Sequence, residues 1–200
     1  AWVEAFTAFG HDLEFAQVRP LIGMGGDRII PKFLPGFSDQ EGEGKKIADR
    51  RKELIIDKFA AKLVPANGSR DLIIKMQQQG LRLLIASSAT SEELSVLLRV
   101  AQVDDLLSQD EATTSSDAEA SKPEPDLIQV ALERLEMQPD RVVMIGDTPY
   151  DIEAAQKVGI RTIAFRCGGF NDEQLKNAIA IYHDPADLLE HYDDSPLSNS

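Results

Sequence analysis

The first third of the chain carries its apolar residues at helical spacing. Trp2, Phe6 and Phe9 recur every three or four positions, and no apolar run of strand length interrupts the segment up to about residue 62. A second stripe with the same period contains Ile47, Leu54, Ile55, Phe59 and Leu63. This pattern predicts a helical domain over residues 1–64.

From about residue 66 onward, short apolar runs alternate with amphipathic segments. The predicted helices span residues 69–80, 91–102, 126–137, 149–158 and 185–192. The predicted strands span residues 81–86, 105–109, 142–145 and 160–165, with a polar loop at 110–125. Such alternation is typical of a parallel sheet with helices on both faces. The predicted fold class is therefore α/β, a Rossmann-like doubly wound parallel sheet over residues 65–192, followed by a flexible tail at 193–200.

Two acidic residues follow the predicted strand at 142–145. Asp147 comes directly after this strand and a glycine, and Asp151 lies four residues further on, in the first turn of the next predicted helix. Thr148, Pro149 and Asp151 also match a capping box, so Asp151 alone is explained equally well as a cap. Because Thr148 already supplies a cap, Asp147 is better explained as a ligand for a metal ion or a polar substrate.

Further polar residues are predicted at the same edge of the sheet. Ser87 and Ser88 follow the strand at 81–86, and Lys122 precedes the helix predicted at 126–137. Because the carboxyl ends of parallel strands meet, these side chains should converge with Asp147. Hydroxyl and ammonium groups bind phosphate oxygens, and carboxylates hold Mg²⁺. Each residue alone has an ordinary explanation as a cap, turn or surface residue, but the ordered set predicts a phosphoryl-transfer site.

Composition narrows the class of partner. Acidic residues outnumber basic ones by 34 to 21, and the formal net charge of −13 argues against nucleic acid or an anionic membrane. Cys167 is the only cysteine, which excludes an intrachain disulfide and a cysteine-rich zinc site. No apolar run approaches the ~18–20 residues that span a bilayer, and no secretory signal pattern is present. We expect a cytoplasmic protein that is a monomer or weak dimer.

The strand-end motifs resemble those of the haloacid dehalogenase-like hydrolases, in the phosphatase and phosphomutase branch with a helical cap. "LLIASSAT" is similar to the family's second motif, "SKPEPDLIQVALERL" to its third, and "VVMIGDTPYDIEAAQKVGI" to its fourth. The resemblance implies that Ser87 and Lys122 stabilise the transferring phosphoryl group, with Ser88 beside them in the substrate site. It also implies that Asp147 binds Mg²⁺ and that Asp151 is a supporting acid of the metal site.

One motif of that family is absent from this sequence. The first motif, DxDGT, supplies the nucleophilic aspartate and a general acid/base and precedes the cap, but no such stretch occurs here. The candidates "VDDLL" and "YDDSP" have the wrong spacing and follow the second motif. The resemblance therefore implies a nucleophile on a strand upstream of Ala1. On that expectation the chain as given is inactive, and without this central strand it should fold poorly.

The glycine-rich stretch "VRPLIGMGGDRIIPKF" is similar to a substrate-specificity loop of this family, which implies that Arg19 and Arg28 bind substrate. A turn between two helices, with both bases facing water, explains the stretch equally well. It is not a dinucleotide-binding loop, because GxGG differs from GxGxxG and no strand precedes it.

The resemblance and the residues together predict a Mg²⁺-dependent phosphatase that acts on a small phosphorylated metabolite through an aspartyl-phosphate intermediate. Two alternatives remain at the level of the sequence. One is a sugar-phosphate mutase of the same family, which shares every residue discussed. The other is a catalytically inactive protein that binds phosphate without transferring it.

Overall fold

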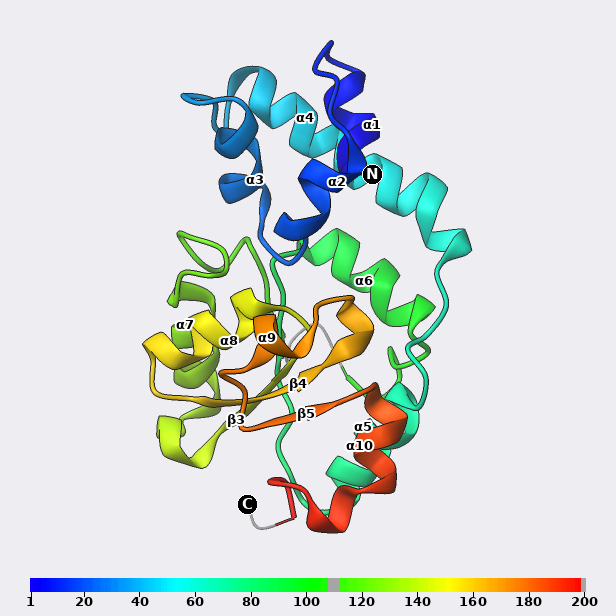
Figure 1. The fold of residues 1–200 in the computed structure, drawn as a ribbon, viewed down its shortest axis with the longest axis vertical. Coiled ribbons are helices and arrows are strands. Elements are labelled where there is room, and N and C mark those ends of the chain that lie inside the picture. Colours follow the sequence, from blue (N-terminus) through cyan, green and yellow to red (C-terminus); the bar gives the residue numbers. More distant parts are fainter. Residues whose placement is uncertain (108–111, 199–200) are drawn as a thin grey trace.

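The protein has a helical lobe that lies against an α/β lobe (Figure 1). We call residues 1–64 the cap lobe and residues 65–198 the core lobe. The structure, a computed structural model, describes residues 1–107 and 112–198. None of the helices in these described ranges is both long enough and apolar enough to cross a membrane.

The cap lobe has its own hydrophobic core. Its helices are α1 (Trp2–Thr7), α2 (Phe15–Val18), α3 (Gly26–Phe33) and α4 (Gly42–Glu53), with 3-10 turns at Arg19–Leu21 and Ala60–Lys62 and a π-helical segment at Leu54–Phe59. The apolar faces of these helices meet in a cluster of buried side chains: Trp2, Ala5, Phe6, Val18, Ile29, Ile30, Ile47 and Leu54. The helical pattern predicted for this part of the chain is confirmed, because its apolar stripes are what the lobe buries.

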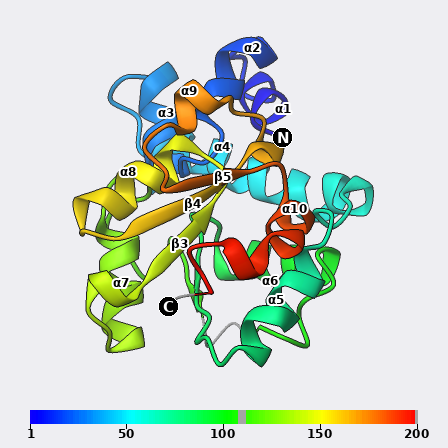
Figure 2. The same cartoon turned by 60° about the horizontal axis from the view of Figure 1, so that its bottom comes forward.

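The core lobe alternates helices with short parallel strands. Its helices are α5 (Ser69–Gln78), α6 (Ser91–Val100), α7 (Asp126–Leu135), α8 (Pro149–Lys157), α9 (Asp172–Leu175) and α10 (Pro185–Glu190). Its strands are β1 (Ile85–Ala86), β2 (Ala112–Thr113), β3 (Val143–Gly146), β4 (Arg161–Phe165) and β5 (Ala180–Tyr182). Strand β1 pairs with β2, and the order β3-β4-β5 forms a second group, shown side by side in Figure 2; every pair is parallel.

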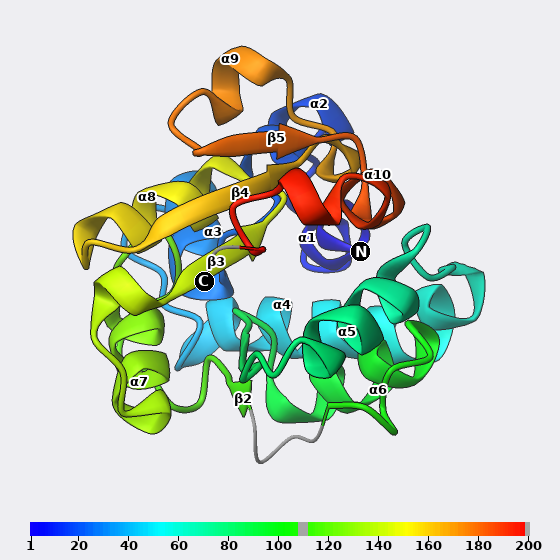
Figure 3. The same cartoon turned by 90° about the horizontal axis from the view of Figure 1, so that it is seen from below.

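Helices cover both faces of the sheet. On β4, Ile163 and Phe165 pack against α5 and α10, whereas Ala164, which points to the opposite face, packs with residues of α8 and α9. Figure 3 shows this layering from below. A strand that is buried on both faces is largely apolar, and the run Ile163, Ala164 and Phe165 accordingly lacks the alternation of a surface strand. The predicted Rossmann-like doubly wound fold is confirmed.

The sheet is nevertheless divided into two parts. In the described ranges no backbone hydrogen bond joins β1 to β3, although Ala86 of β1 and Met144 of β3 pack in the same apolar cluster. Both strands are only half-buried, whereas β4, which is paired on both edges, is almost completely buried. β1 and β3 therefore each have one unpaired edge within a shared layer.

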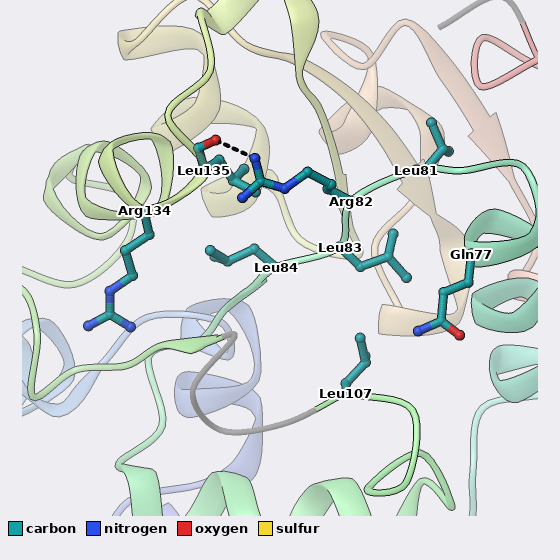
Figure 4. A pocket seen from close by; sticks show the side chains of 8 residues that line it. All are labelled: Gln77, Leu81, Arg82, Leu83, Leu84, Leu107, Arg134 and Leu135. Carbon is teal, nitrogen blue, oxygen red and sulfur yellow. Dashed lines mark hydrogen bonds between the residues drawn. The ribbon is translucent and has the colours of Figure 1, made fainter.

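The segment before β1 illustrates this division. A strand was expected over residues 81–86, but only its last two residues pair with a neighbour. The side chains of Leu81, Leu83 and Leu84 line a cavity of about 550 Å³, at whose edge Arg82 donates to the carbonyl oxygen of Leu135 over 2.9 Å (Figure 4). The strand was predicted at the right position but too long. A strand forms only where its backbone pairs with a neighbour, and within the described ranges only Ile85 and Ala86 have such a partner.

Two strand predictions were wrong. Of the strand expected at 105–109, residues 105–107 form turns and residues 108–109 lie outside the described ranges. The strand that pairs with β1 is β2, inside the predicted polar loop, where the buried Thr113 donates its hydroxyl to the carbonyl oxygen of Ile85 over 3.2 Å. The strand at 160–165 is not the last one, because β5 follows it.

The end of the described chain packs against the core lobe. Ser195 is fully buried, and Leu197 joins the cluster formed by α5, β4 and α10. Within the segment expected to be a flexible tail, at least these two residues are therefore held by packing. The neighbouring helix at 185–192 was predicted and is present as α10.

The two lobes are joined by a buried ion pair. Arg51, near the end of α4, contacts the carboxylate of Glu93 in α6, and its guanidinium carbon lies 5.3 Å from the centre of the Trp2 ring. Glu93 is 2% exposed and also accepts hydrogen bonds from the backbone amide and the hydroxyl of Thr90. Because a buried carboxylate needs its positive partner, this contact ties the cap lobe to the start of α6.

We predict that Arg51→Ala lowers the free energy of unfolding by about 2–4 kcal/mol, because it leaves the Glu93 carboxylate buried without a cation. Denaturant unfolding followed by circular dichroism measures the change. The matched control is Arg50→Ala, on the same helix, where the arginine pairs with Glu53 at the surface. That change should cost no more than about 1 kcal/mol. Equal losses in the two variants would contradict the assignment.

Candidate active site

A buried ion pair lies at the carboxyl edge of the strands. The ammonium of Lys122 is 2.6 Å from Oδ1 of Asp151, and it also donates to the carbonyl oxygen of Ala86 over 3.3 Å. Lys122 is 8% exposed and Asp151 is 4% exposed. Since Ala86 ends β1 and Asp151 lies in the first turn after β3, Lys122 links the two separate parts of the sheet.

Asp151 is saturated with donors from the protein. Its Oδ2 accepts from the amide of Asp147 over 3.2 Å and from the amide and hydroxyl of Thr148 over 3.0 and 2.8 Å. Burial by itself raises the pKa of Asp151, but the charge of Lys122 and the hydrogen bonds from Lys122 and Thr148 outweigh it, so the pKa lies below its usual value. Asp151 is therefore an ionised acid that organises the loop.

The same residues cap helix α8. Thr148 is the N-cap, its hydroxyl accepts from the amide of Asp151, Pro149 is the first helical residue, and Asp151 closes the capping box. The capping explanation that the sequence offered for Asp151 is thus confirmed. It does not exclude a role in the site, because the other carboxylate oxygen faces Lys122.

Asp147 differs from Asp151 in having no cation bonded to it. No ion pair to its carboxylate occurs in the described ranges, and the residue is exposed. The pKa of Asp147 is raised above its usual value, first by desolvation of the carboxylate and then by the neighbouring charge of Asp151. Asp147 is therefore a carboxylate whose charged form a bound cation would stabilise.

Gly168 makes room for Asp147. A Cβ atom at Gly168 would overlap the carbonyl oxygen of Asp147 and lie 2.8 Å from its side-chain carbons. Only glycine allows the loop after β4 to lie this close to the loop after β3. The sequence analysis did not assign a role to Gly168, although the pair Gly168–Gly169 directly after a strand is a recognisable signal of close backbone approach.

The serine loop after β1 lies next to Lys122. The amide of Ser87 donates to the carbonyl oxygen of Thr113, which extends the pairing of β1 with β2, and its hydroxyl oxygen accepts from the amide of Ala89 over 3.2 Å. The hydroxyl of Ser88 is buried without a hydrogen-bond partner in the described part of the chain. Because Lys122 is bonded to the residue just before Ser87, the structure brings these predicted residues together.

The two arginines of the cap lobe are engaged by the core lobe. Arg19 donates to the carbonyl oxygen of Gly168 and stacks 5.0 Å from the centre of the Phe170 ring, so that it lies near Asp147. Arg28 pairs with Asp27 at 3.3 Å and with Glu124 at 3.4 Å. Both arginines therefore contact the core lobe, Arg19 at Gly168 and Phe170 and Arg28 at Glu124, and Arg28 also pairs with Asp27 in its own lobe.

Two further residues at the site were not predicted. The carboxylate of Asp27, in the cap lobe, accepts from the amide of Ser121 over 3.0 Å and from its hydroxyl. Ser121 is buried and directly precedes Lys122. Nothing in the local sequence connects these residues, because they are 94 positions apart and meet only when the lobes come together.

A cation at this site would have few protein ligands. No group of three or more acidic, histidine or cysteine side chains suited to a metal ion occurs in the described ranges. The carboxylate of Asp147 has no ion-pair partner in the described ranges, and the carboxylate of Asp151 accepts a hydrogen bond from the backbone amide of Asp147. Mg²⁺ commonly binds through one or two carboxylates together with water and substrate phosphate, so the donor set is compatible with this ion.

Comparison with known proteins agrees with this geometry. The family model for haloacid dehalogenase-like hydrolases matches residues 2–165. The pyrophosphatase PpaX of Bacillus mycoides is 29% identical over 94 residues, which are 47% of this chain and 43% of that protein. The chain spans about half the length of the curated relatives it matches first.

Solved structures share the fold over nearly the whole chain. A hydrolase from Pseudomonas syringae has a TM-score of 0.87 and 23% identity, covering 97% of this chain and 89% of that one. CbbY from Rhodobacter sphaeroides, solved in complex with phosphate, has a TM-score of 0.76 and 24% identity, covering 94% and 86%. At these identities the likeness shows the fold alone. Because the family model covers more than half of it, this chain belongs to the haloacid dehalogenase-like hydrolases.

Proposed function

We propose that this chain carries the core and cap of a Mg²⁺-dependent phosphatase that acts on a small phosphorylated metabolite through an aspartyl-phosphate intermediate. The observation that supports it most is the buried pair of Lys122 and Asp151 beside Ser87 and Asp147. A buried lysine costs folding free energy unless it is paired, and here its ammonium is held at the edge of the sheet where ligands bind.

Lys122 retains a donor for a phosphate oxygen. An ammonium group has three protons, and the structure uses one for Asp151 and one for the carbonyl oxygen of Ala86. The hydroxyl of Ser87 accepts a hydrogen bond from Ala89, so its own proton is available to a second phosphate oxygen. These two donors would stabilise the negative charge that spreads over the equatorial oxygens during transfer.

Asp147 is the residue we propose as the Mg²⁺ ligand, with Asp151 as the acid that supports its loop. Bound Mg²⁺ supplies charge neutralisation to the phosphoryl group. In support, no ion pair to the Asp147 carboxylate occurs in the described ranges, whereas the four donors on Asp151 leave it little capacity for a metal.

The divided sheet supports a nucleophile on an additional strand. Strands β1 and β3 each have one unpaired edge, and Ala86 of β1 packs in the same apolar cluster as Met144 of β3. A parallel strand inserted between them would satisfy both edges and would end between Ser87 and Asp147. We propose that residues preceding Ala1 in the native protein form this strand and carry the nucleophilic aspartate.

A cavity between the lobes supports a small substrate. It has a volume of about 550 Å³ and is lined by Asp27, Phe37, Ser38, Asp39, Gln40, Ser115, Ser116, Ala118 and Glu119. This volume lies within the range of small-molecule sites. Since Asp27 also contacts the residue before Lys122, the cavity adjoins the proposed phosphate site.

One prediction of the proposed function concerns Asp147. The protein, with its native residues upstream of Ala1, should release phosphate from p-nitrophenyl phosphate only when Mg²⁺ is present. Asp147→Asn should lower this rate by roughly a hundredfold or more, because the metal loses its charged ligand. A colorimetric phosphate assay measures both. The matched control, Asp140→Asn, changes an exposed acid next to the same strand and should leave the rate unchanged.

Three outcomes separate the alternatives. Activity that persists in Asp147→Asn would overturn the metal assignment. A protein that binds inorganic phosphate without releasing it from any phosphate ester would instead be the inactive phosphate-binding alternative. The same activity in a chain that begins at Ala1 would contradict the proposed upstream nucleophile.

A further prediction concerns the ion pair between Lys122 and Asp151. Lys122→Ala should abolish phosphate release and should also lower the free energy of unfolding by about 3–5 kcal/mol, because Asp151 is left charged and buried. Chemical denaturation measures the stability. Combining Lys122→Met with Asp151→Asn should recover much of it, since both charges are then absent. Lys176→Ala, an exposed lysine that pairs with Glu173 at the surface, is the control and should change neither property.

A further inference from the structure

The glycine-rich turn of the cap lobe holds the chain on both sides of Lys122. Before the lysine, Asp27 accepts hydrogen bonds from the amide and hydroxyl of Ser121. After the lysine, Arg28 pairs with Glu124 at 3.4 Å. The turn thus contacts the core lobe at the short segment that carries the phosphate-binding lysine.

The fit between the turn and Ser121 is close. The amide of Gly25 donates to the hydroxyl oxygen of Ser121 over 3.0 Å, and a Cβ atom at Gly25 would lie only 2.6 Å from the Cβ of Ser121. Ser121 is therefore held through its backbone amide and through both functions of its hydroxyl. The glycine at position 25 is explained by this contact, without any bound phosphate.

Fixing Ser121 has a direct consequence for Lys122. Consecutive Cα atoms are a constant ~3.8 Å apart, so a fixed residue 121 sets the point from which the lysine side chain starts. That side chain is long and flexible, and its ammonium must meet Asp151 and Ala86 at once. Displacement of its origin would move the ammonium relative to a bound phosphoryl group.

We propose that Asp27 is a positioning residue for Lys122, so that the phosphate site is complete only while the cap lobe lies against the core lobe. This inference rests on the proposed phosphatase function. It gives Asp27, which also lines the cavity between the lobes, the role of aligning the lysine, whereas the resemblance to a specificity loop implies substrate contacts for Arg19 and Arg28. The Asp27 carboxylate acts through Ser121 and does not touch the phosphoryl group.

A purely structural role for Asp27 makes a different prediction. If the contact only held the lobes together, its loss would weaken substrate retention and raise KM while kcat stayed the same. If it aligns Lys122, its loss would reduce a stabilisation that is needed most in the transition state, and kcat would fall with KM changed much less. The kinetic split therefore distinguishes the two roles.

The experiment compares Asp27→Ala, Asp27→Asn and Asp49→Ala in the protein with its native upstream residues, using p-nitrophenyl phosphate and Mg²⁺. Asp27→Ala should lower kcat by roughly tenfold to a hundredfold, in keeping with a misplaced catalytic group. Asp27→Asn keeps one acceptor oxygen and should be intermediate. Asp49→Ala changes a cap-lobe acid that pairs with Lys45 at the surface; it is the matched control and should equal the wild type.

Hydrogen exchange tests the contact without relying on activity. In Asp27→Ala the amide of Ser121 should exchange roughly tenfold faster or more, because its acceptor is gone, while Asp49→Ala leaves it unchanged. The double variant Asp27→Ala with Ser121→Ala should lose no more kcat than the larger single loss, since the two residues act as one unit.

The outcomes are distinguishable. Unchanged exchange at Ser121, or a change in KM with kcat intact, overturns the positioning role of Asp27. If the wild-type protein releases no phosphate from p-nitrophenyl phosphate, the proposed function is overturned. The hydrogen-exchange result still tests the contact between Asp27 and Ser121 in that case, because it does not depend on turnover. Faster exchange at Ser121 together with a fall in kcat supports the proposal.

Discussion

The ion pair between Lys122 and Asp151 is the interaction on which the site depends. It is buried, and it joins the end of β1 to the first turn after β3, so it crosses the place where the sheet is divided. Two buried charges are tolerated only when geometry and additional hydrogen bonds offset their desolvation, and Thr148 supplies those bonds on the Asp151 side. The two parts of the sheet are thus held in register at one edge by a polar contact, in a layer that is otherwise apolar.

The polar contacts between the cap lobe and the core lobe involve residues close in sequence to the predicted functional residues, because the lobes meet at the carboxyl edge of the strands. The cap lobe lies over the carboxyl edge of the strands (Figure 1), and Arg19, Asp27 and Arg51 of this lobe contact the core lobe there. Its partners in the core lobe are Glu93, which holds Thr90 of the serine loop, Ser121 and Gly168. The position of the cap lobe is therefore coupled to the shape of these loops.

The sequence predicted what local periodicity and strand-end position determine. Helices α5 to α8 and strands β3 and β4 agree with their apolar patterns, because each pattern reflects burial of that element alone. Strands β2 and β5 were missed, since two- and three-residue strands exist only through pairing with distant partners. Asp27 and Glu93 were also missed, because their roles arise from contacts with residues 94 and 42 positions away.

The arrangement of charge bears on the role in metal binding that we propose for Asp147. Lys122 is the buried cation of the site, yet its charge is balanced by Asp151 at 2.6 Å. Asp147 then adds a negative charge that has no cation bonded to it, and the charges of Lys122 and Arg19 act on it only from a distance. In a chain with a net charge of −13, a phosphate group entering this cleft meets repulsion unless further positive charge is present. Under the proposed function, a divalent cation on Asp147 would offset this negative charge, and an unpaired carboxylate would serve phosphate binding in that way.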